Sequence, residues 1–155
     1  PAPYVSGVLL ARLPEAPRVT TVPTALFDLA GPAGLWLAAL LLLGLGVATV
    51  RLGTGDDALA VALATSVAFA PYAWSYDHLL LLVPLVLATG AVARRDRRAA
   101  LAGTVAGAAL LLVGATVLHG LFADARRSES LNGLVPGAMA VLVTVLLWPP
   151  RRTRN

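Results

Sequence analysis

The side chains best suited to chemistry lie in one stretch, residues 70–84, between two long apolar runs. There Trp74 and Tyr76 come just before Asp77 and His78, which open the second apolar run. A carboxylate and an imidazole at the lip of a transmembrane helix cost free energy unless they face water, a partner or a ligand. The carboxylate could bind a sugar hydroxyl, a metal or a cationic partner, and the histidine a phosphate or a hydroxyl. This lip is therefore the first candidate for a functional site.

The same residues also have a purely structural explanation. Ser75 is of a type that caps helix N-termini, and an acid such as Asp77 in the first turn gains about 0.3–1 kcal/mol from the helix dipole. His78 could be an interfacial histidine without a further role. Both explanations stay open at the level of sequence.

Two later groups could join the site from the loop that follows the fourth long apolar run. His119 ends that run, although a cation near a helix C-terminus is favourable for its own sake. Arg126 and Arg127 follow, and an arginine offers a bidentate fork to phosphate. A plain solvated loop is the alternative for these arginines.

Composition indicates a polytopic membrane protein. Of the 155 residues, 58% are hydrophobic and 13% charged, whereas soluble domains are roughly half apolar and about a quarter charged. The absence of cysteine excludes disulfides and thiolate chemistry, and the scattered histidines and carboxylates predict no metal site and no cofactor. The net charge of +4 does not indicate nucleic-acid binding, because the arginines cluster at the ends of apolar runs. Arginine without lysine, amid much alanine and leucine, suggests a GC-rich bacterial genome.

The expected fold is all-α, a transmembrane bundle of about five helices, because lipid leaves backbone polar groups no water partner. The five candidate spans are residues 33–50, 58–74, 77–93, 99–118 and 131–148. Pro84 is expected to kink the third span. Gly103 and Gly107 form a small-xxx-small pair that favours close helix packing rather than function.

Three regions follow from this pattern. Residues 1–32 are proline-rich and read as an outward-facing loop with short interfacial helices, within 4–13 and 24–29, or as a plain connecting loop. Residues 33–150 form the transmembrane region, and 151–155 a basic cytoplasmic tail. Because the chain opens on proline rather than methionine, we expect it to be the C-terminal part of a longer protein.

The arginines predict the orientation of the chain in a bacterial plasma membrane. With five spans, Arg51, the loop 94–98 and the tail 151–155 fall on one side, and this side holds most of the arginines. The positive-inside rule places it in the cytoplasm. The lip at Asp77 and the loop 119–132 then face outward together.

Residues 70–84 resemble glycosyltransferase family 87, which comprises polytopic mannosyltransferases of the C-type superfamily. The late helices of that family carry a pattern like Ser-Pro-x-x-Trp-x-x-Asp, followed by a leucine-rich run with a proline. The matching positions here are Pro71, Trp74, Asp77, the leucines at 80–82 and Pro84, and Ala70 stands where the family has serine. Residues 4–13 look like a further family element that lacks its usual asparagine.

The resemblance implies transfer of mannose, or a related sugar, from a polyprenyl-phosphate donor to a lipid or glycan acceptor outside the cytoplasm. It implies that Tyr76, Asp77 and His78 bind donor phosphate or acceptor, with Trp74 as a platform and His119 and Arg126 as further contacts. The general base of such enzymes is an acid in the first outer loop, which has no counterpart in these residues, so we expect the chain alone to be inactive. The rival hypothesis is part of a transporter or a non-catalytic membrane subunit. A transporter should carry ionisable groups near the middle of its helices.

Overall fold

The chain is all-helical wherever its structure is described. The computed structural model describes residues 21–70, 75–121 and 131–148, apart from the side chains of 75–77 and 115–121. Within these ranges there are six α-helices, one 3₁₀ helix and no strand: α2 (Val22–Ala30), α3 (Pro32–Leu52), α4 (Asp56–Phe69), η1 (Ser75–Leu81), α5 (Leu82–Ala93), α6 (Arg97–Leu121) and α8 (Leu134–Leu147). The prediction of an all-α fold is confirmed.

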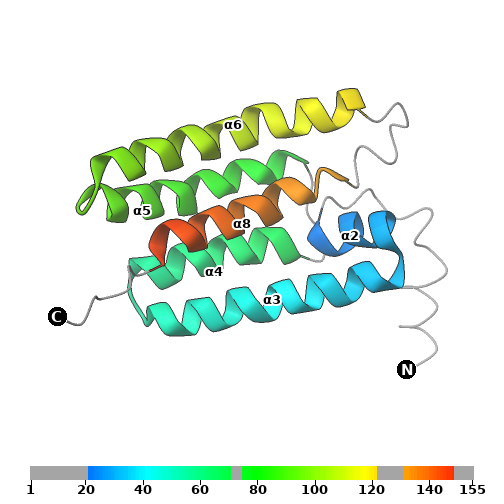
Figure 1. The fold of residues 1–155 in the computed structure, drawn as a ribbon, viewed down its shortest axis with the longest axis horizontal. Coiled ribbons are helices and arrows are strands. Elements are labelled where there is room, and N and C mark those ends of the chain that lie inside the picture. Colours follow the sequence, from blue (N-terminus) through cyan, green and yellow to red (C-terminus); the bar gives the residue numbers. More distant parts are fainter. Residues whose placement is uncertain (1–20, 71–74, 122–130, 149–155) are drawn as a thin grey trace.

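The long helices lie side by side with alternating direction, so that successive connections fall at opposite ends of the bundle (Figure 1). Helix α4 packs against α3, α5 and α8, and α6 packs against α5 and α8. The short α2 lies at one end of the bundle, against α3 and α8 (Figure 1). Helices α4 and α8 therefore share the centre of the structure.

Small side chains form much of the interior. Helix α4 buries alanine on its inner face, at positions such as Ala60, Ala64 and Ala68. On α6 the predicted packing of Gly103 and Gly107 is confirmed: a Cβ on Gly103 would lie 2.7 Å from a Leu146 methyl of α8, and one on Gly107 2.6 Å from a Leu85 methyl of α5. These two glycines therefore let α6 approach two neighbouring helices at once.

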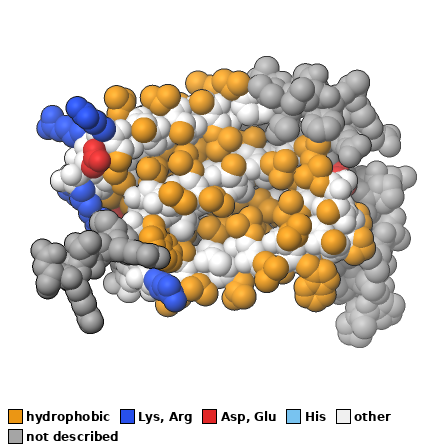
Figure 2. Space-filling view, in the orientation of Figure 1, with side chains coloured by type: hydrophobic (Ala, Val, Ile, Leu, Met, Phe, Trp, Pro, Cys, Tyr) orange, Lys and Arg blue, Asp and Glu red, His pale blue; other side chains and the backbone are white. Residues whose placement is uncertain are grey.

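The outer faces of the bundle are apolar as well. Trp36 and Leu43 of α3 and Leu112 of α6 are among many large apolar side chains that stay exposed. Figure 2 shows hydrophobic side chains across the whole middle of the molecule, with the arginines gathered toward one end. Residues 32–52 and 97–114 are long and apolar enough to cross a membrane, and only 22% and 17% of them are buried, which is unlike the core helix of a soluble protein. The apolar segments 78–93 and 134–147 are shorter.

Several helix limits differ from the predicted spans. Helix α4 ends at Phe69 instead of residue 74, because proline at position 71 disfavours helical backbone in the residue before it. The third span begins as the 3₁₀ helix η1 and becomes α-helical only at Leu82. The last span begins at Leu134 rather than 131. The predicted short helix within 24–29 corresponds to α2, whereas 4–13 lies outside the described residues.

The change of helix type lies directly before Pro84, the residue at which a kink is predicted. Pro84 is the third residue of α5, and Pro136 is likewise the third residue of α8. The first turn of an α-helix has N–H groups without intrahelical acceptors, so a proline there removes no helical hydrogen bond. Both prolines are fully buried and pack in the interior.

The glycines of α3 provide a test of this packing. Gly34 lies directly against the backbone of Leu26 in α2, whereas a Cβ on Gly44 of the same helix would meet nothing within 4 Å among the described residues. We expect Gly34→Ala to lower the free energy of unfolding by about 2 kcal/mol or more, because backbone cannot move aside as a side chain can. Gly44→Ala, the matched control, should change it by less than about 1 kcal/mol. Unfolding in mixed detergent micelles measures both, and equal effects would contradict the α2–α3 contact.

Candidate functional site

The residues predicted to form the site are described to different extents. Residues 76 and 77 lie in η1 and residue 119 lies in α6, two residues before its end, but the side chains of all three are outside the described part. Trp74 and Arg126 lie outside it entirely. Only His78 is described in full, and it is buried, with 7% of its surface exposed. The structure therefore places His78 and leaves the joining of the six residues as a prediction.

The periodicity of η1 explains why His78 points inward. A 3₁₀ helix has three residues per turn, so residues three apart lie on the same face. His78 and Leu81 are buried, whereas Leu79 and Leu80 between them are more than half exposed. Leu81 belongs to the hydrophobic core, and η1 packs against α4, α5 and α8. Leu81 therefore fixes η1 in the core and turns His78 toward the same interior.

Sequence reasoning missed two other buried polar residues at this end of the bundle. Thr21 precedes α2 and is 3% exposed, and Asn132 precedes α8 and is 8% exposed. The two segments touch, because the α-carbon of Gly133 lies against the Thr21 backbone. The Thr21 hydroxyl is 3.1 Å from that of Thr24. Neither residue is ionisable, and the only available signal was an asparagine opening an apolar run on the outward side.

Asn132 has an unusual environment for an amide. Its Oδ1 is buried and accepts no hydrogen bond from the residues that the structure describes. A buried acceptor left unsatisfied costs about 1–3 kcal/mol. A donor for this oxygen must therefore come from elsewhere in the chain, from water or from a ligand. Together Thr21, His78 and Asn132 form what we call the polar end of the bundle.

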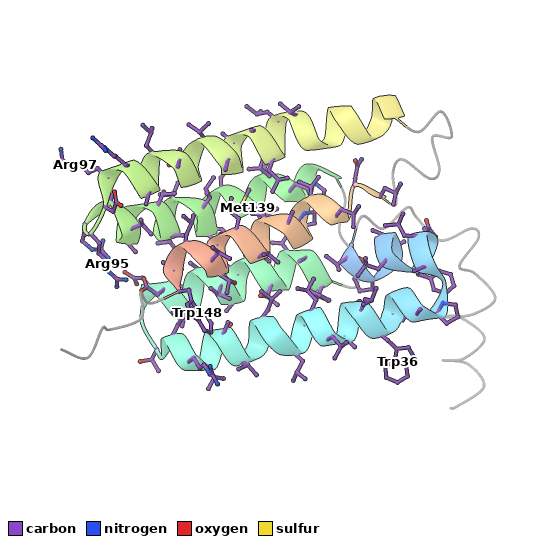
Figure 3. All side chains as sticks on the ribbon, viewed as in Figure 1. Trp36, Arg95, Arg97, Met139 and Trp148 are labelled. Carbon is purple, nitrogen blue, oxygen red and sulfur yellow. The ribbon has the colours of Figure 1, made fainter. Side chains whose placement is uncertain are left out.

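The opposite end, which we call the arginine end, carries the charged residues. Arg95 and Arg97 both lie there (Figure 3). The Arg95 guanidinium is 3.7 Å from the Asp57 carboxylate of α4, and both side chains are partly exposed. The Asp96 carboxylate accepts hydrogen bonds from the N–H groups of Arg98 and Ala99, at 2.8 and 3.1 Å, and so caps α6. The two ends of the bundle therefore differ in chemistry: buried polar side chains characterise one, and exposed arginines the other.

The polar end offers hydrogen-bonding groups. No group of three or more metal-ligating side chains occurs among the described residues. An imidazole, a hydroxyl and a carboxamide can bind hydroxyl or phosphate oxygens, and they can do so without burying a net charge. No family model, curated protein or solved structure matches the chain. The site is therefore argued from its own residues and from the resemblance at 70–84.

Replacing Asn132 tests whether the protein itself satisfies the buried oxygen. We expect Asn132→Leu, which has nearly the same volume, to leave the free energy of unfolding within about 1 kcal/mol of the original, since no hydrogen bond to Oδ1 is lost. Asn132→Asp should lower it by about 3 kcal/mol or more, because it buries an unpaired charge. Unfolding in mixed micelles at neutral pH measures both. A loss above about 2 kcal/mol for Asn132→Leu would show that the chain supplies a partner.

Proposed function

We propose that this chain contributes its helices to a multi-pass membrane glycosyltransferase. The enzyme would move a mannose-like sugar from a polyprenyl-phosphate donor to a lipid or glycan acceptor on the outer face of a bacterial plasma membrane. The observation that carries the proposal is the position of His78, which is buried in η1, at the opposite end of α5 from the arginines at 94–98. This is the end at which the resemblance of residues 70–84 puts the donor.

Helix lengths support five crossings of the membrane. At 1.5 Å per residue, α3 extends about 31 Å and α6 about 37 Å, which matches a hydrocarbon core of about 30 Å. The 3₁₀ geometry of η1 adds about 2 Å per residue, so η1 and α5 together extend about 32 Å. Helices α4 and α8 reach only about 21 Å each. Both lie at the centre of the bundle, where neighbouring helices surround them, and flanking residues and local thinning of the bilayer can cover the difference.

The polar end has groups suited to binding a sugar carried on a phosphate. A histidine donates a hydrogen bond to a phosphate or hydroxyl oxygen, and the Asn132 carboxamide both donates to and accepts from sugar hydroxyls. Asp77, adjacent to His78, would bind a hydroxyl of donor or acceptor. None of these groups is proposed as the general base, which the resemblance puts in another loop. Their role is to position the donor at the mouth of the bundle.

The distribution of charge favours a transferase over a transporter. Transporters place ionisable groups near the membrane midplane, where substrates and ions bind. In the described part of this chain, the charged residues lie in connections or at helix ends: Asp28, Arg51, Asp56, Asp57, Arg94, Arg95, Asp96, Arg97 and Arg98. The middles of the helices offer no charged group within these ranges. A site at the bundle mouth fits this arrangement better than a central one.

Cysteine labelling tests the proposed orientation, and the natural chain has no cysteine to interfere. Asp28 in α2 and Thr54 between α3 and α4 are both exposed and belong to opposite ends of the bundle (Figure 1). We expect a membrane-impermeant maleimide to label Asp28→Cys on intact cells and Thr54→Cys only after permeabilisation. The cysteine-free parent is the control. Labelling of both variants from the same side would overturn the five-span arrangement.

Sugar transfer tests the site itself. Native membranes containing the full-length protein would be incubated with radiolabelled polyprenyl-phosphate mannose, and transfer to endogenous acceptors measured. We expect Asp77→Asn and His78→Gln to reduce transfer about tenfold or more, the effect of losing a hydrogen bond to a charged group, worth about 1.5–3 kcal/mol. Leu79→Ala, at the exposed neighbouring position, is the matched control and should retain activity.

The outcomes separate the proposal from simple misfolding. Monodisperse elution and unchanged helical circular dichroism of each variant would show that it is folded. Full activity in folded Asp77→Asn and His78→Gln proteins would remove these residues from the site. Absence of transfer by the unmodified full-length protein, with mannosyl, glucosyl and galactosyl carriers alike, would overturn the proposed function.

A further inference from the structure

The arginine end holds more positive charge than its acidic residues neutralise. The described acids are Asp56, Asp57 and Asp96, of which Asp57 pairs with Arg95 and Asp96 caps α6. The remaining arginines are exposed and form no ion pair with any described residue: Arg51, Arg94, Arg97 and Arg98. We call these four the arginine patch.

Two members of the arginine patch stand where helix electrostatics disfavour them. Arg97 and Arg98 are the first two residues of α6. A helix N-terminus carries partial positive charge, which favours anions and disfavours cations. The Asp96 cap offsets part of this cost, but the capping carboxylate binds backbone N–H groups rather than a guanidinium. An anion from outside the chain would relieve the repulsion.

Apolar side chains adjoin the arginine patch. Val50, directly before Arg51, is 80% exposed. Leu101, on α6, is 66% exposed and follows Arg97 and Arg98 by four and three residues, so all three share one helix face. An arginine above an exposed leucine matches the headgroup and acyl chain of one phospholipid. A nucleic acid or an acidic protein would have no use for these apolar neighbours.

We propose that the arginine patch binds the headgroups of anionic phospholipids in the adjoining leaflet. The proposal rests on the membrane location given under the proposed function. Guanidinium groups bind phosphate through paired N–H donors, and basic residues near an anionic membrane surface each contribute about a fivefold gain in affinity. The bundle would thus recruit anionic lipid at its arginine end and not at its polar end.

Tryptophan fluorescence can read the two ends separately. Trp148 lies at the arginine end and Trp36 at the opposite end, and both are exposed (Figure 3). Lipids with brominated acyl chains quench a nearby tryptophan, so the quenching reports which lipid is in contact. Two reporter proteins are needed: Trp36→Phe with Trp74→Phe leaves Trp148, and Trp148→Phe with Trp74→Phe leaves Trp36. Each would be reconstituted in two mixtures of phosphatidylglycerol and phosphatidylcholine. In one mixture the phosphatidylglycerol is brominated, and in the other the phosphatidylcholine is brominated.

We expect phosphatidylglycerol to be preferred over phosphatidylcholine about fivefold at Trp148 and not at Trp36. Replacing Arg94, Arg97 and Arg98 together by glutamine should abolish the preference at Trp148, and replacing them by lysine, which keeps the charge, should retain most of it. High salt should weaken the preference. Both leaflets have the same composition, so the direction of insertion does not affect the readout.

Each outcome decides one proposal. Equal quenching by both lipids at Trp148, or a preference that survives the three glutamines, would overturn lipid binding by the arginine patch. Equal preference at both tryptophans would also overturn it, because the effect would then not belong to the arginine end. If brominated phosphatidylcholine quenched neither tryptophan in a helical, monodisperse protein, the membrane location itself would fail.

Discussion

The structure depends on one constraint: its outside is as apolar as its inside, so hydrophobicity alone does not determine which face of a helix is buried. Side-chain size does so instead. Alanine is the commonest buried residue, while leucine, valine and tryptophan dominate the exposed faces of α3 and α6. In lipid, helices associate through close van der Waals packing because burial of apolar surface gains nothing over contact with acyl chains. Ala60 and Ala64 of α4 are fully buried, and Gly103 and Gly107 of α6 lie against leucine side chains of neighbouring helices, Leu146 and Leu85.

This constraint also explains where chemistry can occur. In the described long helices the threonine hydroxyls donate to the carbonyl four residues earlier, as Thr65 does to Val61 and Thr144 to Ala140, so the proposed site lies at an end. The two ends are different: exposed arginines lie at one, and the buried polar side chains of Thr21, His78 and Asn132 lie at the other. Under the proposed function, the buried polar groups would hold a sugar phosphate, whereas the exposed arginines would contact anionic lipid.

Apolar runs and arginine positions were sufficient to predict the all-α class and the alternation of the helices. The limits of α3 were predicted within two residues, because glycine and arginine mark its ends clearly. The 3₁₀ start of the third span was missed, since an apolar run looks the same in either helix type. His78 was found because it is ionisable, but Thr21 and Asn132 were missed: their burial results from the packing of α2 against α8, which no local pattern reveals. Their chemistry follows only from their environment.

Helix α2 gives the polar end its rigidity. Glycines on two neighbouring helices let it approach closely: Gly34 of α3 lies against the Leu26 backbone, and Gly137 of α8 against the Val22 side chain. Gly133, just before α8, lies against the backbone of Thr21 in the same way. The backbone contacts of Gly34 and Gly133 cannot relax as side-chain contacts do. The α2 region therefore holds the start of α8, and with it Asn132, in one position. At the arginine end, by contrast, Gly103 of α6 lies against the flexible side chain of Leu146 in α8. The backbone contacts are therefore concentrated at the polar end, where the proposed binding of a sugar phosphate would require hydrogen-bonding groups at fixed distances.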